Sequence, residues 1–505
     1  MTDTLHALRP ERVPGVPLSR LAPGSPEVPV TGVTLDSRTV LPGDLYVALP
    51  GAHVHGAQFV DAATAAGAIA VLTDARGGEL AGHATIPVLV TSDPRHAMAT
   101  AAAEVYGHPG DAMALFGLTG TNGKTSTTFL LQAALEAIDV RVGTIGTLGF
   151  WVGKTALEGS RSTITTPEAP DLQALLALMR ERGAHAVAIE VSSVALDRGR
   201  VDELTFAVSG FTMFGQDHLD FHGDLESYYR AKTRLFLDGR SRAAVVNIDD
   251  PAGMRLAGEI RRDASARLTT TGTAPEAEYR LLETSPREDG SWCAQVATPQ
   301  GRLDFVVGML GDFNVRNALT ALAMVGESGG DVAHAAKGLA HAAVPGRMQR
   351  LALAGDSPNV LIDFAHTPQA VSAALAALPP GRRIAVLGCG GDRDATKRGP
   401  MGAAAARGAD VVIVTDDNPR SETPLAIREA VLAGALAEPA ARARSIRDGG
   451  DRRGAIESAL REARPGDWVA ILGKGHERGQ TIGTTIHAFE DATVVRELWS
   501  TIQGA

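Results

Sequence analysis

Short apolar runs rich in β-branched residues recur along the chain, and longer alanine-rich stretches with helical spacing of apolar positions separate them. The runs are Met113–Leu118, His185–Val191, Ala243–Ile248, Ile384–Leu387, Asp410–Asp416 and Trp468–Leu472. Alternating strand and helix signals predict parallel sheets with right-handed crossovers, and therefore an α/β fold. Residues 279–305 instead alternate around turns at Asp289-Gly290 and Gln300-Gly301, which predicts a β-meander.

Two breaks in this pattern divide the chain. One is the Tyr106–Gly110 stretch and the other is the Pro345-Gly346 turn, after which a new strand series starts at Val360. A length of 505 residues suggests about three domains. We expect an N-terminal α/β domain over 1–108, a central parallel-sheet domain over 109–343 and a C-terminal Rossmann-like α/β domain over 344–505.

Composition narrows the class of protein. Hydrophobic residues are 44% and charged residues 21%, which is typical of a soluble globular chain. The net charge of −10 argues against a protein that coats nucleic acid or an anionic membrane. The 2 cysteines have no ligand spacing, and no stretch reaches about 18 apolar residues. The N-terminus lacks an apolar signal region, so we expect a cytoplasmic protein.

A glycine-rich segment carries the clearest chemistry. Strand-like Leu115–Leu118 precedes Gly120-Thr121-Asn122-Gly123-Lys124-Thr125-Ser126, and an apolar helix pattern follows over 129–137. Backbone N–H groups at the start of a helix bind phosphate, Lys124 reaches the outer phosphates, and the Thr125 hydroxyl can bind Mg²⁺. The segment therefore predicts an ATP site, although Leu118 stands where the strict Walker pattern has glycine.

Two further segments place acids and imidazoles near such a site. Glu190 is an acid at the end of the predicted strand in the run His185–Val191. The carboxyl end of a parallel strand is where a ligand crevice is expected, although a capping acid is an equal alternative. Residues 217–223 (DHLDFHG) hold two His and two Asp, which suit metal binding but also a surface turn. The sequence around Lys232, taken alone, is typical of an exposed lysine on a helix.

The segment GTNGKTST at 120–127 resembles the phosphate loop of the ATP-dependent Mur ligases of peptidoglycan synthesis, which the folylpolyglutamate synthetases share. The resemblance extends over nearly the whole chain. It implies Mg²⁺ binding by Glu190 and His218, and a carbamate on Lys232 that binds a second Mg²⁺. It also implies nucleotide contacts by Asn317, Arg347 and Asp363.

Four other segments resemble the Mur ligases that add the third peptide residue. By that resemblance, Leu35 and Ser37 contact the uridine diphosphate, and the peptide arm is held by Thr165, Thr166, Ser192 and Arg200. The amino-acid site comprises Arg393, the segment Asp417-Asn418-Pro419-Arg420, Gly473 and Glu477. Arg393 and Arg420 suit the distal carboxylate of meso-diaminopimelate, and Glu477 suits its distal ammonium.

The implied activity is ATP-dependent addition of meso-diaminopimelate to UDP-N-acetylmuramoyl-L-alanyl-D-glutamate through an acyl phosphate, by a monomer without nucleic-acid or membrane partners. The chain departs from the family pattern at Val194, Arg198, Met213, Arg478 and Gly479. The last two adjoin the amino-acid site, so L-lysine and L-ornithine stay open as substrates.

A folylpolyglutamate synthetase and a catalytically silent nucleotide-binding relative are remoter alternatives. No base for the incoming amine is assigned; His218 and His222 are near, but metal binding competes for them.

Overall fold

The computed structural model describes residues 8–13, 15–51, 53–157 and 165–504. The chain forms two compact units, Met1–Leu282 with Gln295–Leu303 and Arg316–Leu339, and Glu283–Ala294 with Asp304–Val315 and Ala340–Ala505. The first seven residues, on which the expectation about an export signal partly rests, lie outside the described residues. Within the described ranges, no helix has the length and apolar character needed to cross a membrane.

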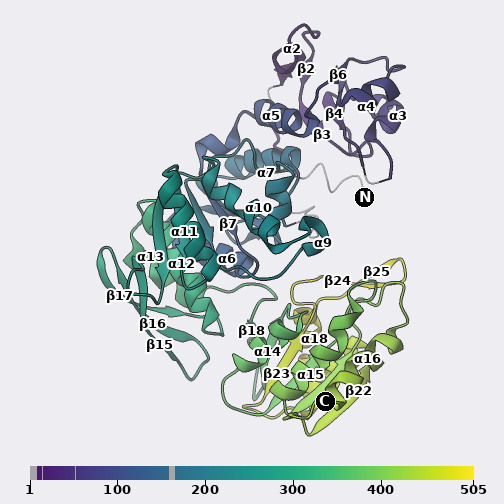
Figure 1. Ribbon diagram of the computed structural model, residues 1–505. Helices are drawn as coiled ribbons and strands as arrows, with labels where there is room; N and C mark the ends of the chain where they lie inside the picture. Colours follow the sequence, from purple (N-terminus) through teal and green to yellow (C-terminus); the bar gives the residue numbers. More distant parts are fainter. Residues whose placement is uncertain (1–7, 14, 52, 158–164, 505) are drawn as a thin grey trace. The chain divides into compact units, whose positions relative to one another are not determined.

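A parallel four-stranded sheet of order β3-β4-β5-β6 occupies the N-terminal part of the first unit (Figure 1). Its strands are β3 (Gly32–Thr34), β4 (Asp44–Ala48), β5 (Ala70–Thr73) and β6 (Val88–Val90). The accompanying elements are β1 (Val16–Pro17), α2 (Leu18–Leu21), β2 (Pro29–Val30), η1 (Gly56–Phe59), α3 (Val60–Ala65), α4 (Ala75–Leu80), α5 (Pro94–Tyr106) and η2 (Pro109–Ala112). Alternate residues of β4 enter two separate cores, so the sheet is buried on both faces.

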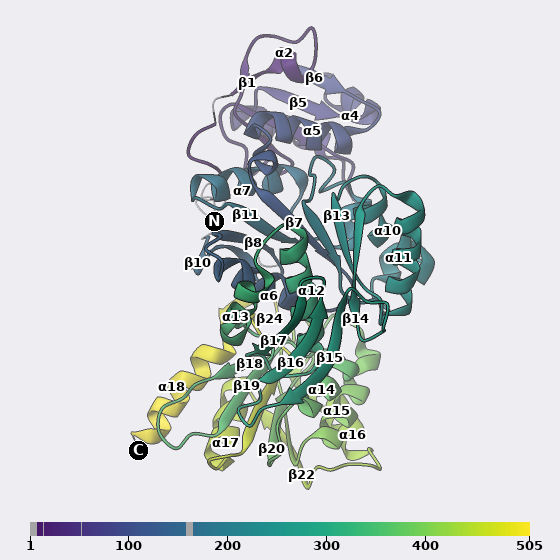
Figure 2. The same cartoon turned by 90° about the vertical axis from the view of Figure 1, so that its left-hand side faces the viewer.

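The second sheet is eleven-stranded, in the order β10-β9-β8-β11-β7-β12-β13-β14-β15-β16-β17. Its strands are β7 (Ala114–Thr119), β8 (Val142–Gly146), β9 (Gly149–Val152), β10 (Thr155–Ala156), β11 (Ala186–Glu190), β12 (Val208–Phe211), β13 (Ala243–Asn247), β14 (Arg267–Gly272), β15 (Tyr279–Pro286), β16 (Trp292–Thr298) and β17 (Gly301–Val307). The six strands from β8 to β14 in this order are mutually parallel. Strands β15 to β17 extend the sheet as the predicted meander (Figure 2).

Helices cover this sheet because each crossover between parallel strands needs one. They are α6 (Lys124–Glu136), α7 (Ala169–Glu181), α8 (Ser193–Asp197), α9 (Leu219–His222), α10 (Leu225–Leu237), α11 (Pro251–Asp263), α12 (Phe313–Glu327), α13 (Val332–Gly338) and η3 (Leu339–His341). Helices α7, α8, α10 and α11 share one apolar core with alternate residues of β11 and β13. Helix α6 packs against α13. The arrangement leaves the carboxyl ends of β7, β8 and β11 side by side.

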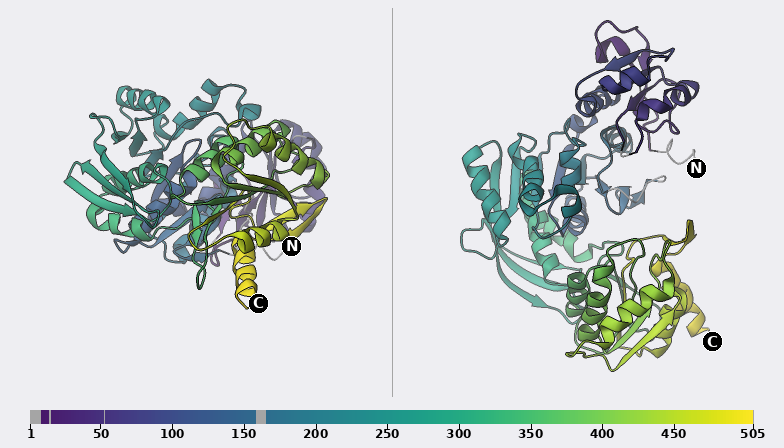
Figure 3. Two further views of the ribbon diagram at one scale, coloured as in Figure 1. Left: turned by 90° about the horizontal axis from the view of Figure 1, so that it is seen from below. Right: turned by 45° about the vertical axis from the view of Figure 1, so that its right-hand side comes forward.

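The second unit contains a six-stranded sheet of order β18-β19-β23-β20-β21-β22, parallel except at β18. Residues 383–472 of this unit are drawn in green to yellow in Figure 3. Its strands are β18 (Gln349–Leu351), β19 (Asn359–Asp363), β20 (Arg383–Leu387), β21 (Val411–Thr415), β22 (Ser445–Gly450) and β23 (Trp468–Leu472). Further elements are α14 (Pro368–Ala376), η4 (Ala395–Lys397), α15 (Arg398–Gly408), α16 (Pro424–Leu436), α17 (Arg452–Glu462), the hairpin β24 (Gly479–Ile482) and β25 (Thr485–Ala488), and α18 (Asp491–Gln503).

Alternate residues of these strands face opposite cores. Leu361 packs with residues of α14, α15 and α16, whereas Val360 and Ile362 pack with residues of α17 and α18. This two-sided burial is typical of a doubly wound fold. The predicted α/β fold class and all six predicted strands are confirmed within a residue or two at their ends. The domain boundaries at 108 and 343 stay a prediction.

Candidate functional site

The predicted phosphate loop connects the buried strand β7 to helix α6. Gly120 has φ of +146° and Gly123 has φ of +88°, conformations that side chains with a Cβ atom rarely adopt. The Thr121 N–H donates to the Met213 carbonyl at 2.7 Å, and the Thr212 hydroxyl donates to the Asn122 carbonyl at 2.6 Å. The segment after β12 thus fixes the loop at the N-terminus of α6, whose first turn contains Thr125 and Ser126.

Two lysines converge on this loop. Lys124 Nζ donates to the carbonyls of Gly120 at 2.8 Å and Thr121 at 3.0 Å, and Lys232 Nζ also donates to the Gly120 carbonyl at 2.8 Å. Lys232 is 1% exposed, and its Nζ lies 4.4 Å from the centroid of the Tyr228 ring. Burial, followed by repulsion from Lys124, lowers the pKa of Lys232 well below its usual value. Lys232 is therefore not the exposed helical lysine that its sequence alone suggests.

A buried carboxylate also contacts this segment. Glu190, at the end of β11, is 1% exposed, and its Oε2 accepts from the Thr125 hydroxyl at 2.9 Å. Thr147, directly after β8, donates its N–H to Glu190 Oε1 and its hydroxyl to Oε2, both at 3.0 Å. Three neighbouring parallel strands therefore assemble an oxygen-lined site next to the phosphate loop.

The predicted metal ligand His218 packs against Tyr228, with ring centroids 6.3 Å apart, and the Tyr228 hydroxyl is 3.2 Å from the Thr121 hydroxyl of the phosphate loop. His218 has φ of +51° before the short helix α9, its side chain is 48% exposed, and its Nε2 is 3.6 Å from Asp217. His222 pairs with the Ser193 hydroxyl at 2.9 Å. Among the residues that the structure describes, no three His, Cys, Asp or Glu side chains gather as a metal site. Metal binding by Glu190 and His218 therefore stays a prediction.

The predicted peptide-arm residues form a connected group beside Glu190. The Thr166 hydroxyl donates to the Glu190 carbonyl at 2.7 Å and accepts the Ser192 N–H at 3.1 Å. Arg200 donates to the Thr166 carbonyl at 2.9 Å, and Thr165 and Thr147 hydroxyls are 3.3 Å apart. Helix α8 begins here, with Ser192 as its N-cap. Residues far apart in the chain thus meet at one edge of the sheet.

Thr147 was not identified from the sequence, although its position directly after a buried strand is a usable signal. We expect Thr147→Val to lower kcat about tenfold, because a hydroxyl bond to a buried carboxylate is lost while the backbone N–H bond is kept. Steady-state phosphate release measures this effect. Thr493→Val, at an exposed position of helix α18, is the matched control, and equal rates in both variants would contradict a positioning role.

The predicted uridine-site residues lie in the loop between β3 and β4. Leu35 and Ser37 are partly buried there, at the carboxyl edge of the N-terminal parallel sheet. Within the loop, the Thr34 hydroxyl accepts the Asp36 N–H at 3.2 Å and Arg38 pairs with Asp36 at 2.8 Å. Such an edge is the usual location of a ligand in an open parallel sheet.

The predicted nucleotide residues are divided between the two units. Asn317 belongs to the first unit, where its Oδ1 would lie 2.7 Å from a Cβ atom placed on Gly123. Arg347 and Asp363 belong to the second unit. Asp363 ends β19 and accepts the Met348 N–H at 2.7 Å, and burial raises the pKa of its carboxyl. The Arg347 guanidinium lies 4.5 Å from the centroid of the Phe364 ring.

The predicted amino-acid residues meet at the carboxyl edge of the six-stranded sheet. The Gly473 N–H donates to the Asp363 carbonyl at 3.0 Å, and the Gly391 N–H donates to the Asn418 carbonyl at 2.9 Å. Arg420 donates to the Gly391 carbonyl at 2.6 Å. Ser421 and Glu422, directly after it, bind Asp392 through bonds of 2.6 Å.

These bonds bring together the loops that carry Arg393, Asp417, Pro419 and Arg420. The Arg393 side chain is exposed. Glu477 joins the group through its Oε2, which accepts from the Asn418 amide at 2.7 Å. A pair of guanidinium groups and a carboxylate at one sheet edge suit a ligand that carries both signs of charge.

Several departures from the family pattern have a local explanation. Met213 contacts the phosphate loop through its carbonyl, so its 39% exposed side chain is free to vary. The Arg198 guanidinium lies 5.3 Å from the Phe221 ring centroid. Gly479 begins the β24–β25 hairpin, where an added Cβ would come within 2.8 Å of Ile486 Cγ2. Nothing in the structure explains Val194.

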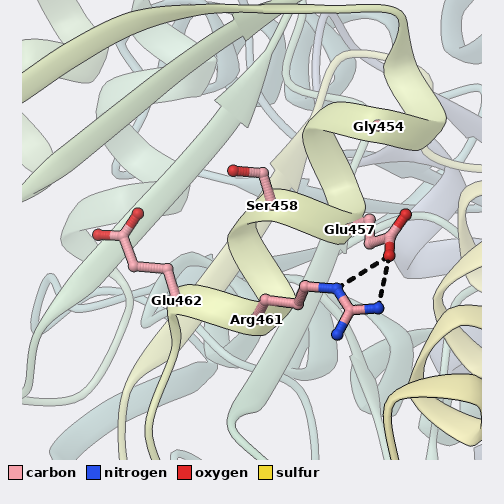
Figure 4. Close-up of a pocket in the computed structure, with 5 residues that line it drawn as sticks. All are labelled: Gly454, Glu457, Ser458, Arg461 and Glu462. Carbon is pink, nitrogen blue, oxygen red and sulfur yellow. Dashed lines mark hydrogen bonds and ion pairs between the residues drawn. The ribbon is translucent and has the colours of Figure 1, made fainter. Parts of the chain in front are cut away.

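A surface hollow elsewhere in the second unit contains none of the predicted site residues. Figure 4 shows it along one face of α17, where Arg461 pairs with Glu457 at 2.8 Å. Its other lining residues are Gly454, Ser458 and Glu462. The predicted residues instead follow the carboxyl ends of parallel strands.

Strand, glycine-rich loop, Lys124 and Thr125 at the start of a helix, with Glu190 beside them, define an ATP-using enzyme of the P-loop type. Three family models match the chain: the "Mur ligase family, catalytic domain" at residues 29–106, the "Mur ligase middle domain" at 118–325 and the "Mur ligase, glutamate ligase domain" at 346–475. The chain belongs to the Mur ligase family, whose members are ATP-dependent enzymes that form peptide bonds.

Similar proteins match over nearly their whole length. The "UDP-N-acetylmuramoyl-L-alanyl-D-glutamate--2,6-diaminopimelate ligase" of Streptomyces coelicolor is 45% identical, over 98% of this chain and 99% of that protein. The "UDP-N-acetylmuramyl-tripeptide synthetase" of Leifsonia xyli subsp. xyli is 44% identical, over 93% of each. A solved UDP-N-acetylmuramoyl-L-alanyl-D-glutamate--2,6-diaminopimelate ligase aligns with a TM-score of 0.69 and 29% identity, covering 97% of this chain and 99% of that chain.

Proposed function

We propose that this protein is the ligase that adds meso-diaminopimelate to UDP-N-acetylmuramoyl-L-alanyl-D-glutamate, using ATP, in peptidoglycan biosynthesis. The observation that carries the proposal is that Arg393, Arg420 and Glu477 are on loops that follow three neighbouring strands of one parallel sheet, where Arg420 bonds to Gly391 and Asn418 bonds to Glu477. Relatives above 40% identity bear the name of this ligase, which supports the same reading. We propose further that the protein acts as a cytoplasmic monomer.

The first step takes place at the phosphate loop. The D-glutamyl carboxylate of the substrate attacks the γ-phosphorus of ATP, the bond to the β-phosphate oxygen breaks, and ADP leaves an acyl phosphate behind. Lys124, next to the Gly120 and Thr121 carbonyls, is placed to bind phosphate oxygens and neutralise their charge. Thr165, Thr166, Ser192 and Arg200 hold the peptide arm whose carboxylate reacts.

The residues near the loop suit Mg²⁺, which prefers oxygen ligands. The Thr125 hydroxyl and the Glu190 carboxylate, 2.9 Å apart and buried, offer two such ligands. A carbamate on Lys232 would offer a third, since the amine plus carbon dioxide gives a carbamate anion and a proton. His218 completes the proposed set. When bound, Mg²⁺ supplies positive charge that stabilises the phosphates.

The second step joins the amino acid to the activated carboxylate. The neutral amine attacks the acyl carbon, a tetrahedral intermediate forms, and its collapse releases inorganic phosphate and one proton and leaves the amide. Arg393 and Arg420 bind the distal carboxylate of diaminopimelate, and Glu477 binds its distal ammonium. Their role is to orient the reacting amine, which lowers the entropic part of the barrier.

L-Lysine and L-ornithine are the second candidates for the added amino acid. Arg478 and Gly479 favour these two amino acids. Both residues stand where the family usually has others after Glu477, and they change the charge and size of the amino-acid site. We assign diaminopimelate as the substrate because lysine and ornithine lack the distal carboxylate that the Arg420 guanidinium would bind. The uridine-site resemblance at Leu35 and Ser37 counts against a folylpolyglutamate synthetase.

Phosphate release tests the proposal directly. The protein is incubated with ATP, Mg²⁺ and UDP-N-acetylmuramoyl-L-alanyl-D-glutamate, and meso-diaminopimelate, L-lysine and L-ornithine are offered in turn. We expect the highest kcat/KM with meso-diaminopimelate. A preference for lysine or ornithine would overturn the choice of amino acid, turnover of folate substrates alone would overturn the ligase assignment, and no turnover would indicate a silent relative.

Arg420→Met should raise the KM for meso-diaminopimelate by about 30-fold, because a charge-assisted bond to the distal carboxylate is worth roughly 2 kcal/mol. The KM for L-lysine should change by no more than about threefold, since lysine has no group for this guanidinium. Initial rates with each amino acid measure both values. Arg453→Met, an exposed arginine on α17, is the matched control, and an equal rise for both amino acids would refute the assignment.

A further inference from the structure

A buried lysine lies within the proposed amino-acid site without a role assigned to it. Lys474 follows β23 directly, between Gly473 and Gly475, and its side chain is 0% exposed. A buried ammonium is unfavourable unless its donors are all satisfied. The hydrogen bonds of Lys474 therefore indicate how its buried ammonium is stabilised and which groups it holds.

The ammonium group of Lys474 makes three hydrogen bonds, which use all of its donors. Nζ donates to Glu477 Oε2 at 2.8 Å, to the Gly479 carbonyl at 2.7 Å and to Asn418 Oδ1 at 3.2 Å. Asn418 is in the loop after β21, Glu477 is in the loop after β23, and Gly479 is the first residue of β24. Lys474 is thus the centre of the polar contacts between them.

The side-chain amide of Asn418 is committed to the same network. Its Oδ1 also accepts the Thr481 N–H at 2.9 Å, and its Nδ2 donates to Asp417 Oδ1 at 3.1 Å and to Glu477 Oε2 at 2.7 Å. All donor and acceptor positions of the amide are therefore occupied by protein. Asn418 is placed to hold Glu477 rather than to bind a ligand through its side chain.

The network treats the two carboxylate oxygens of Glu477 differently. Oε2 accepts from both Lys474 and Asn418, whereas Oε1 accepts no hydrogen bond from any residue in the described part of the chain. The Glu477 side chain is 34% exposed, in contrast to the buried lysine. One oxygen is thereby fixed inside the protein, and the other is left for a ligand.

We infer that Lys474 is a positioning residue for the amino-acid substrate, because its buried ammonium, together with Asn418, holds Glu477 with Oε1 directed to the substrate's distal ammonium. The inference rests on the proposed function and adds to it. A positively charged residue is used here to orient the carboxylate that recognises a positively charged group. Without Lys474, Glu477 would keep only the bond from Asn418, and recognition would cost more of the entropy of fixing the carboxylate.

The test uses the full-length protein and three variants: Lys474→Met, Asn418→Asp and Glu477→Gln. For Lys474→Met we expect the KM for meso-diaminopimelate to rise about 30-fold, with kcat within about threefold and the KM for ATP within about twofold. Asn418→Asp keeps the oxygen that Lys474 contacts but directs a second carboxylate oxygen at Glu477, so its KM should rise as well. Lys337→Met, an exposed lysine on α13, is the control.

A double-mutant cycle separates positioning from general support of the fold. If Lys474 acts through Glu477, adding Lys474→Met to Glu477→Gln should raise the KM by no more than about twofold further. Additive effects, an unchanged KM in Lys474→Met, or an equal rise in the KM for ATP would overturn the inference. If Lys474→Met does not fold, Asn418→Asp takes its place in the cycle with Glu477→Gln, and the KM values for meso-diaminopimelate and ATP are compared in the same way. Failure of both variants to fold would show that the network is purely structural and would overturn the inference.

Failure of the proposed function gives a different result. If the wild-type protein prefers L-lysine or L-ornithine, the cycle is measured with that amino acid, whose side-chain ammonium Glu477 would bind in the same way. If the wild-type protein releases no phosphate with any of the three diamino acids, the proposed function is wrong and the inference falls with it. A fully active wild type with a Lys474→Met variant of unchanged KM overturns the inference alone.

Discussion

Lys124→Met should reduce kcat for phosphate release by about 10³-fold, the largest effect expected for any single substitution. Catalysis of phosphoryl transfer depends on positioning and on neutralising charge, and Lys124 is the loop cation at the start of α6. Its ammonium contacts the Gly120 and Thr121 carbonyls. Methionine keeps most of the length of the side chain but removes the charge.

The measurement is steady-state phosphate release at saturating ATP and both other substrates. Lys337→Met, which removes an exposed lysine from α13, should behave as the wild type does. The thermal transition of Lys124→Met should stay close to that of the wild type, because Lys124 is only partly buried. A kcat within tenfold of the wild-type value would contradict the proposed role of the loop.

Lys232→Ala should lower kcat by about 10²- to 10³-fold, because a ligand that stabilises the charged phosphates is removed. The native protein should carry one added carbon dioxide on Lys232, visible by mass spectrometry under non-denaturing conditions. Burial and the neighbouring Lys124 lower the pKa of the Lys232 ammonium, so the neutral amine that reacts with carbon dioxide is available at a lower pH than in an exposed lysine.

The pH dependence of this modification has a definite sign. As the pH falls below the lowered pKa of Lys232, the amine becomes protonated, the carbamate is lost and activity decreases. Added bicarbonate should restore activity to the wild type after carbon dioxide is removed, and it should have no effect on Lys232→Ala. Wild-type activity that is insensitive to carbon dioxide, with no added mass on Lys232, would contradict the carbamate.

The elements that position the site could be predicted from the chain alone. β7, β11 and β23 are continuous apolar runs because both faces of a parallel sheet are buried, and such runs are easily seen in a sequence. Gly120 and Gly123 are also local signals, since their positive φ angles depend on residue type. The resemblance to the Mur ligases added roles that no local pattern contains.

Burial of charged side chains could not be predicted in the same way. Lys232 has the sequence surroundings of an exposed helical lysine, yet it is 1% exposed and bound to Gly120, 112 residues away. Lys474 is 0% exposed because loops after two different strands close around it. Thr147 reaches Glu190 only because β8 and β11 are adjacent in the sheet although 43 residues separate the two side chains.

The sequence by itself determined the α/β fold class, the phosphate loop and the membership of a ligase family, because these depend on local residue pattern and on motifs that are contiguous in the chain. The tertiary structure decided which oxygens surround Thr125, where Lys232 lies, and how Lys474 and Asn418 hold Glu477. The physical reason is the parallel sheet, which brings the carboxyl ends of strands together in an order unrelated to their order in the chain.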